Sequence, residues 1–203
     1  MALAGIEQAQ LLSDIFAGVL GQYAPRSVAV LGCAGGNGFD RIAPSVSRVV
    51  GVDINPDYVA AAEARFRGHF RDLELITGDI QKPEVSFVPV DLVFAGLVLE
   101  YVSVEDVIGR MPGMLAAGGR WVTVLQLPGA GLPQISRSPY SSLQALAGAL
   151  RLVPPARVRS AAAARGYVER ESHQVVSGGG KPFQVQVFGA RSGLVAEHPP
   201  HHE

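Results

Sequence analysis

Residues 28–38 read Val-Ala-Val-Leu-Gly-Cys-Ala-Gly-Gly-Asn-Gly, an apolar run that breaks abruptly into four glycines within seven residues. The apolar part is typical of a buried strand, and the glycines let the backbone turn sharply and approach a ligand closely. A second strand pattern, Arg48-Val-Val-Gly-Val-Asp53, ends on an acid 21 residues after Gly32. A strand, a glycine turn, a helix and a strand ending in Asp or Glu predict a half-site for an adenosine-containing cofactor, with the acid on the ribose hydroxyls.

Composition and charge narrow the class of protein. The 203 residues are 48% hydrophobic and 17% charged, which is enough apolar material for one folded domain with a sizeable core. The net charge is −1 and there is no long basic run, so we expect neither nucleic acid nor a membrane as a partner. Cys33 is the only cysteine, which excludes an internal disulfide and a cysteine-based zinc cluster, and we expect no bound metal.

Two further absences bear on location. The first residues lack the basic segment of a signal peptide. No apolar run reaches the roughly 18 residues that a membrane-spanning helix needs. We therefore expect a cytoplasmic protein.

Hydrophobic periodicity predicts that strands and helices alternate through much of the chain. Apolar residues at helical spacing predict an N-terminal helix within residues 1–25. The alternation that follows it favours a parallel sheet covered by helices on both faces. Strands are expected at about 27–32, 48–53, 73–77, 90–95 and 120–126, and helices at about 37–45, 56–67 and 103–116.

The pattern changes after the fifth expected strand. Residues 127–153 begin with a loop rich in proline, glycine and serine, and we interpret the segment as a candidate lid over an acceptor site. A helix over 154–164 precedes two strand-like runs at 167–176 and 183–189, whose short glycine-rich link requires an antiparallel hairpin. Residues 192–203 are expected to be a disordered tail. The fold class is therefore α/β: a Rossmann-like three-layer sandwich with a mostly parallel seven-stranded sheet and a C-terminal antiparallel hairpin.

This layout resembles the class I S-adenosylmethionine-dependent methyltransferase family over about residues 27–190. The first motif of that family has the form acid-x-Gly-x-Gly-x-Gly. Gly32 and Gly36 take the places of its outer glycines, and Ala34 takes the place of the middle one. The family's acid aligns with Val30. The chain thus departs from the family's first motif at two positions, Val30 and Ala34.

Further motifs of the same family follow in the expected order. Asp53 corresponds to the acid that binds the ribose, and Asp79 corresponds to the acid that contacts the adenine amino group. Residues 91–102, Asp-Leu-Val-Phe-Ala-Gly-Leu-Val-Leu-Glu-Tyr-Val, resemble the fourth motif of the small-molecule methyltransferases. Gly166-Tyr167 resembles the Gly-Phe pair before the family's sixth strand.

The resemblance implies a single methyltransferase domain over residues 1–203. It would transfer a methyl group from S-adenosylmethionine to an unidentified small-molecule acceptor by in-line displacement, and the product would be S-adenosylhomocysteine. The residues that it assigns to the cofactor are Gly32, Cys33, Ala34, Gly36, Asn37, Asp53, Ile54, Asp79, Ile80, Ala95 and Gly96.

Four residues are candidates on the acceptor side. Glu100 and Tyr101 follow the fourth expected strand, where either one could orient or deprotonate the acceptor. The alternative is that Tyr101 packs against the sheet and that Glu100 is solvated or caps a helix. Gln126 at the end of the fifth strand and Tyr140 after the loop are candidates for binding the acceptor. A base is needed only if the acceptor carries a proton that must leave.

Two other functions fit parts of the pattern. Gly32, Gly35 and Gly38 also match a Gly-x-x-Gly-x-x-Gly spacing, which is compatible with an NAD(P)-dependent oxidoreductase. Against this function, the sequence has no Tyr-x-x-x-Lys pair, and the expected first strand follows a helix. The departures at Val30 and Ala34 leave open a methyltransferase-like protein that binds without catalysing.

Overall fold

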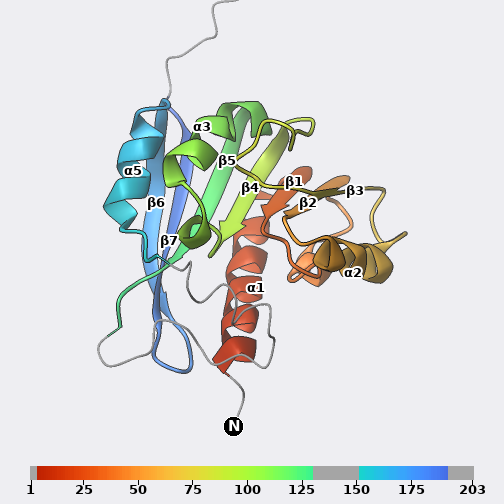
Figure 1. Ribbon diagram of the computed structural model, residues 1–203, viewed down its shortest axis with the longest axis horizontal. Coiled ribbons are helices and arrows are strands. Elements are labelled where there is room, and N and C mark those ends of the chain that lie inside the picture. Colours follow the sequence, from red (N-terminus) through yellow and green to blue (C-terminus); the bar gives the residue numbers. More distant parts are fainter. Residues whose placement is uncertain (1–3, 130–150, 192–203) are drawn as a thin grey trace, which may run out of the picture.

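The structure, a computed structural model, describes residues 4–129 and 151–191 (Figure 1). Within these ranges seven strands form one sheet in the order β3-β2-β1-β4-β5-β7-β6. Strands β1 to β5 run parallel to one another, and β7 is antiparallel to both β5 and β6. This arrangement confirms the expected fold class. The strands are β1 (Ser27–Leu31), β2 (Arg48–Asp53), β3 (Asp72–Thr77), β4 (Val90–Gly96), β5 (Leu115–Gln126), β6 (Tyr167–Val176) and β7 (Pro182–Ala190).

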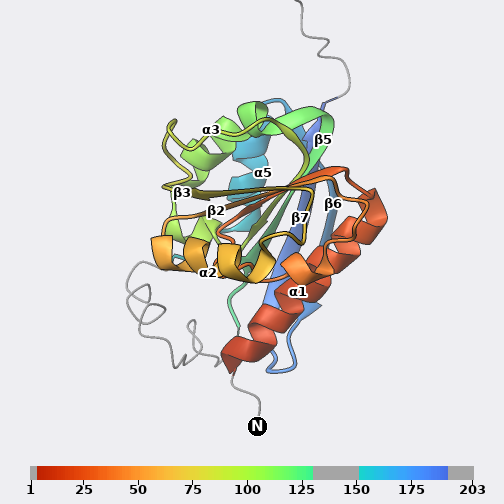
Figure 2. The same ribbon diagram turned by 90° about the vertical axis from the view of Figure 1, so that its right-hand side faces the viewer.

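Helices cover both faces of the sheet, as Figure 2 shows. On β1, Val28 and Val30 pack toward one face with Phe16 of α1, whereas Ala29 and Leu31 pack toward the other face. This alternation is what a strand buried on both sides requires. Helices α1 (Ala4–Tyr23) and α2 (Pro56–Phe66) lie on the first face, and α3 (Val104–Met114) and α5 (Pro155–Ala163) lie on the second.

Side-chain caps fix where two of the helices begin. The Asn55 side chain accepts a hydrogen bond from the backbone N–H of Asp57, and Pro56 occupies the first helical position of α2. The Ser103 side chain caps α3 through the N–H of Asp106. Both caps stand directly after loops at the carboxyl ends of strands, so they fix the lengths of those loops.

The prediction of a helix at 37–45 is wrong, because only a single 3-10 turn, η1 (Phe39–Arg41), forms there. Gly36 and Gly38 have φ angles of 77° and 83°, which a right-handed helix does not allow. Pro44 then disfavours a helical conformation for the residue before it. The glycine turn is therefore longer and less regular than the sequence pattern indicated.

Strand β5 also begins earlier than the expected 120. Leu115 pairs with Val90, and the register then shifts so that Arg120 pairs with Leu92. Gly118 has a φ of 78° inside this irregular stretch, so the Gly118-Gly119 pair lies within a bulged strand.

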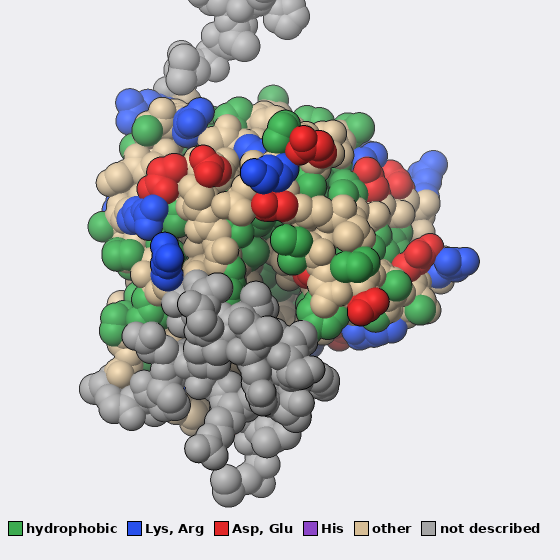
Figure 3. Space-filling view, in the orientation of Figure 1, with side chains coloured by type: hydrophobic (Ala, Val, Ile, Leu, Met, Phe, Trp, Pro, Cys, Tyr) green, Lys and Arg blue, Asp and Glu red, His purple; other side chains and the backbone are tan. Residues whose placement is uncertain are grey.

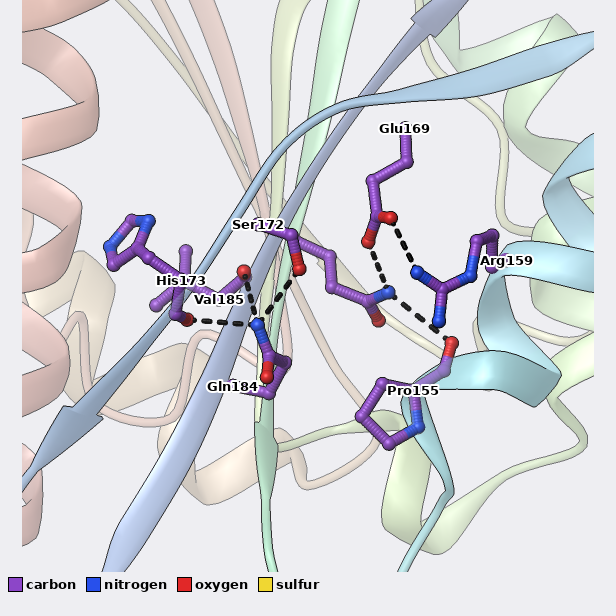
Figure 4. A network of polar contacts seen from close by, with 8 residues as sticks. Pro155, Arg159, Glu169, Ser172, His173, Gln184 and Val185 are labelled. Atoms are coloured by element: carbon purple, nitrogen blue, oxygen red, sulfur yellow. Dashed lines mark hydrogen bonds and ion pairs between the residues drawn. The ribbon is translucent and has the colours of Figure 1, made fainter.

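A polar network joins the C-terminal hairpin to α5 (Figure 4). Gln186, fully buried on β7, donates from Nε2 to Glu169 Oε1 at 2.6 Å and to the backbone oxygen of Pro155 at 3.2 Å. The other carboxylate oxygen of Glu169 accepts from Arg159 at 2.7 Å. On the same strand, Gln184 donates to Ser172 Oγ at 2.9 Å. These contacts join β6 and α5 to β7.

Some expectations fall on the parts of the chain that the structure leaves out. Of the candidate lid at 127–153, residues 130–150 lie outside the described ranges, and so do residues 192–203. Among the described helices, none is both long enough and apolar enough to cross a membrane. In the same ranges, no three His, Cys, Asp or Glu side chains gather into a group that could hold a metal ion.

Candidate cofactor and acceptor site

The candidate residues gather at one edge of the sheet. Strands β1 to β5 are parallel, so the loops after Leu31, Asp53, Thr77, Gly96 and Gln126 all leave the sheet at the same edge. The strand order reverses between β1 and β4, since β2 and β3 lie on one side and β5 on the other. Ligands of open α/β sheets bind at such a switch point, outside the carboxyl ends of the strands.

The glycine turn after β1 is pinned to β2. The N–H groups of Gly32 and Cys33 both donate to the backbone oxygen of Val52, at 2.8 and 3.0 Å. Gly32 has a φ of 71°, and a Cβ atom there would lie 3.1 Å from Val98 Cγ2, on the loop after β4. The turn therefore runs close to both β2 and the β4 loop, which are the two sides of the switch point.

Within the turn, Cys33 and Gly36 face the protein interior. The Cys33 side chain is only 1% exposed, and burial together with the nearby Asp53 raises the pKa of its thiol to about 12. A neutral, buried thiol is a packing group, so a cofactor would meet only the backbone of Cys33. Gly36, at a φ of 77°, leaves no room for a Cβ atom, which would lie 2.6 Å from Phe66 Cε2 on α2.

Asp53 links the turn to the start of α2. Its Oδ2 atom accepts from the N–H of Ala34 at 2.8 Å, and its Oδ1 atom accepts from the N–H of Asn55 at 2.9 Å. Each carboxylate oxygen keeps a further lone pair for another donor. Asp53 is not the cap of α2, because that position belongs to Asn55. The next residue, Ile54, is an exposed apolar side chain, with 68% of its surface accessible.

Asp79 follows β3 and is held in its ionised form. Burial tends to raise the pKa of this carboxyl group, but two hydrogen bonds from Gln81 and the charges of Lys82 and Arg110 outweigh it and hold the pKa below its usual range. Ile80, also assigned to the cofactor by the resemblance, points into the core and is buried there. Asp79 and the exposed Ile54 thus remain the side chains available beyond β2 and β3.

A role for Gln81 was not among the predictions from the sequence. Its Oε1 atom accepts from the N–H of Ser103 at 2.8 Å, while its amide and backbone donate to Asp79. Gln81 therefore joins the β3 loop to the start of α3. An Asp followed two residues later by a hydrogen-bonding side chain is a known turn pattern, and it is the signal that could have indicated this contact.

The end of β4 carries backbone strain. Ala95 is buried, and its backbone oxygen accepts from Thr123 Oγ1 at 3.1 Å, whereas Gly96 would place a Cβ atom 2.9 Å from Phe94 Cε1. Leu97 has a φ of 55°, and Ala34 across the switch point has a φ of 47°. Left-handed conformations in residues other than glycine occur at functional sites more often than elsewhere. Sequence patterns do not reveal such a φ at Leu97.

Glu100 is buried on the β4 and β5 side of the edge. It lies in η2 (Leu99–Tyr101), is 2% exposed, and accepts the N–H of Gln126 on Oε1 at 2.8 Å. Its Oε2 atom is buried without a hydrogen-bond partner among the described residues. Burial raises the pKa of this carboxyl group to about 7, although the hydrogen bond from Gln126 acts in the opposite direction. The alternative of a solvated Glu100 is therefore wrong.

The other acceptor-side candidates are placed differently from one another. Tyr101 is 36% exposed, and burial and then the charge of Glu100 raise the pKa of its hydroxyl group. Gln126 is buried at the end of β5. Asn37, which the resemblance assigns to the cofactor and not to the acceptor, lies in the glycine turn and is exposed. Tyr140 lies outside the described residues.

Comparisons with known proteins agree with this geometry. Residues 28–119, from β1 through the irregular start of β5, match the family model of a methyltransferase domain. A search of curated proteins finds no match. The matched segment includes the glycine turn, Asp53, Asp79 and Glu100.

Solved structures show the same fold at low sequence identity. The N-methyltransferase NodS from Bradyrhizobium japonicum WM9, in complex with S-adenosylhomocysteine, superimposes with a TM-score of 0.67 at 19% identity, covering 89% of this chain and 86% of its own. Magnesium protoporphyrin IX methyltransferase from Synechocystis PCC 6803, also with bound S-adenosylhomocysteine, gives 0.65 at 14% identity, with 92% and 84% covered. Geranyl diphosphate C-methyltransferase from Streptomyces coelicolor A3(2) gives 0.65 at 16% identity, with 88% and 80% covered.

Proposed function

We propose that this protein transfers a methyl group from S-adenosylmethionine to a small-molecule acceptor and releases S-adenosylhomocysteine. The hydrogen bond from the Ala34 N–H to Asp53 Oδ2 carries the proposal, because it brings the glycine motif and the ribose acid into contact at the switch point. NodS and the geranyl diphosphate enzyme, which share the fold, were both solved with S-adenosylhomocysteine. The small molecules named for two of the neighbours, magnesium protoporphyrin IX and geranyl diphosphate, are the basis for proposing a small-molecule acceptor here.

The residues at the edge fit an adenosine-containing ligand. The free lone pairs of Asp53 suit ribose hydroxyls, and the exposed Ile54 offers an apolar surface to a ring. Ionised Asp79 would accept from the adenine amino group.

One family contact has no counterpart. Val30, at the place of the family's acid, is buried in the apolar cluster that includes Phe16 and Phe94. It offers no acceptor for the amino group of the methionine moiety. We propose that the affinity for the cofactor depends correspondingly more on Asp53 and Asp79.

Methyl transfer depends more on the alignment of the two reactants than on reactive side chains. When bound, S-adenosylmethionine supplies an electrophilic methyl group on a sulfonium, with a neutral thioether as the leaving group. Holding two reactants in line can lower a barrier by about 7–11 kcal/mol. The rigid turn between β1 and β2, pinned through Val52 and Asp53, would hold one reactant in place.

The surface agrees with a small acceptor. In Figure 3, acidic and basic side chains are interspersed over the described part of the visible face, and no extended basic area is seen there. A large polyanion binds through such an area. We therefore propose a small organic molecule as the methyl acceptor.

Calorimetric titration of the full chain tests the proposed function. S-adenosylmethionine, S-adenosylhomocysteine, NAD and NADP would be titrated separately. Binding of the first two alone is expected. Binding of NAD or NADP instead would favour the oxidoreductase alternative, and binding of none would contradict the cofactor assignment.

A further inference from the structure

Glu100 is a buried carboxyl group that is not among the residues assigned to the cofactor. Its Oε1 atom is fixed by the N–H of Gln126 at 2.8 Å, and its Oε2 atom has no partner within the described part of the chain. Buried polar atoms without partners are rare in folded proteins, and a carboxylate oxygen needs a donor or a proton. The unpaired oxygen therefore points to a donor that arrives with a ligand.

The position of Glu100 separates it from the two acids assigned to the cofactor. Asp53 and Asp79 follow β2 and β3, whereas Glu100 follows β4 and binds the end of β5. Val98, two residues before Glu100, lies against Gly32 of the glycine turn. Glu100 thus stands beside the cofactor cradle, on the side where a second reactant would lie.

No described basic side chain neutralises Glu100. None of the ion pairs of the described residues includes it, and Arg151, whose N–H donates to the Glu100 backbone oxygen, has an exposed side chain. Tyr101 is the neighbouring titratable group, and the charge of Glu100 raises its pKa. The pKa of Glu100 itself is raised by burial and not by a nearby charge. A cationic donor would supply both the missing hydrogen bond and the missing counter-charge.

We infer that the methyl acceptor is an amine, bound as an ammonium group against Glu100 Oε2, and that Glu100 accepts the proton which must leave before the nitrogen can react. This inference rests on the proposed function, since it needs a methyl donor in the adjacent cradle. It goes further by naming the chemical class of the acceptor and the group that takes its proton.

The proposed step conserves atoms and charge. The Glu100 carboxylate takes one proton from the ammonium group and becomes a carboxylic acid, which leaves a neutral amine with a lone pair. The lone pair forms the N–C bond to the methyl group while the C–S bond breaks, and both electrons of that bond stay on sulfur. The products are a methylated ammonium, a neutral carboxylic acid and a thioether. Burial lowers the pKa of an amine and raises that of a carboxyl group, which favours the proton transfer.

The inference is tested with pairs of compounds in which a hydroxyl group replaces an amino group. Primary amines, each paired with the alcohol of the same carbon skeleton, would be titrated into the full chain saturated with S-adenosylhomocysteine. The same pairs would be incubated with methyl-labelled S-adenosylmethionine and the products analysed for N-methylation. We expect amines to bind and to be methylated in preference to their alcohols.

Glu100→Gln identifies the group responsible, because Gln keeps an oxygen for the Gln126 N–H but carries no charge. We expect amine affinity to fall about tenfold to hundredfold, which is the range for a lost hydrogen bond between charged groups, while S-adenosylmethionine affinity stays unchanged. Glu105→Gln is the matched control, since Glu105 is exposed and pairs with Arg157 at the surface. It should leave both affinities unchanged.

The outcomes separate this inference from the proposed function. If S-adenosylmethionine binds but alcohols bind as well as amines, or no amine is bound or methylated, the amine acceptor is wrong. Equal amine affinity in the wild type and in Glu100→Gln would likewise overturn the role of Glu100. Failure of S-adenosylmethionine to bind would overturn the proposed function and this inference with it.

Discussion

The N–H of Ala34 donates to the Asp53 carboxylate at 2.8 Å, although Ala34 must adopt a φ of 47° to do so. A left-handed conformation costs a residue with a side chain about 1–2 kcal/mol. The hydrogen bond to a charged acceptor contributes about 1.5–3 kcal/mol, which is enough to offset that strain. Asp53 therefore shapes the glycine turn, whatever else it binds.

The first prediction concerns Asp53. Replacement by Ala removes the acceptor of two backbone N–H groups, so we expect the protein to lose about 2–3 kcal/mol of stability and S-adenosylmethionine binding to fall below detection. Asp53→Asn keeps one oxygen and should lose less stability, while still binding the cofactor at least about tenfold more weakly. Denaturant unfolding and calorimetry measure the two effects. Asp57→Asn, on the exposed first turn of α2, is the control; unchanged cofactor binding in Asp53→Ala would contradict the site.

The second prediction separates two kinds of glycine. In Gly36→Ala the new methyl group would collide with Phe66 in a backbone conformation that disfavours Ala, so we expect a loss of about 2–4 kcal/mol. Gly18→Ala lies in α1 with nothing within 4 Å, and we expect it to stabilise the protein by up to about 1 kcal/mol. Thermal unfolding of the two variants measures the difference. A Gly36→Ala protein as stable as the wild type would show that the turn can rearrange.

The strands could be predicted from the sequence because their apolar runs are long and no other pairing register would bury those runs equally well. Four of the five parallel strands lie within about two residues of their expected positions. Strands β1, β2 and β4 are buried on both faces, whereas β3 lies at the edge of the sheet and is only partly buried. The glycine turn could not be predicted in the same way. Its positive φ angles at Ala34 and Gly36 depend on Asp53 and Phe66, which are distant in sequence.

The candidate site was predictable in part for a similar reason. The position of a residue at a strand end follows from the strand, so Asp53, Asp79 and Glu100 were found at the right edge. The direction of a side chain depends on packing between elements, and sequence spacing could not reveal that Ile80 turns inward. The burial of Glu100 likewise comes from its contact with Gln126 on a neighbouring strand.

The third prediction concerns Asp79 and the adenine amino group. Asp79→Asn should weaken S-adenosylhomocysteine binding about tenfold, the effect of losing one hydrogen bond to a charged acceptor. The analogue in which an oxygen replaces the adenine amino group should bind the variant and the wild type with more similar affinities. Calorimetry with both ligands measures this. Glu84→Gln, in the same loop and exposed, is the control, and equal losses for both ligands would place Asp79 away from the amino group.

The last prediction follows from the pKa of Glu100. Burial raises this pKa to about 7 in the folded protein from about 4.5 in the unfolded chain, so the folded state binds the proton more tightly. The favourable contribution to stability is fully present below pH 4.5 and is lost as the pH rises toward 7, by about 3 kcal/mol at most. Glu100→Gln cannot titrate, so its stability relative to the wild type should increase over this interval and then level off.

Denaturant unfolding of both proteins between pH 4.5 and 8 gives the stability difference directly. Other titrating groups affect both proteins alike and cancel in that difference, apart from Tyr101, whose hydroxyl group remains protonated throughout this interval because its pKa is raised. The Glu105→Gln variant should show the opposite sign at a lower pH, because the Arg157 hydrogen bond lowers the pKa of Glu105. A difference between Glu100→Gln and the wild type that does not change with pH would mean that Glu100 is ionised in the folded protein. In that case a cation outside the described residues must already neutralise it, and the amine would not be needed for that purpose.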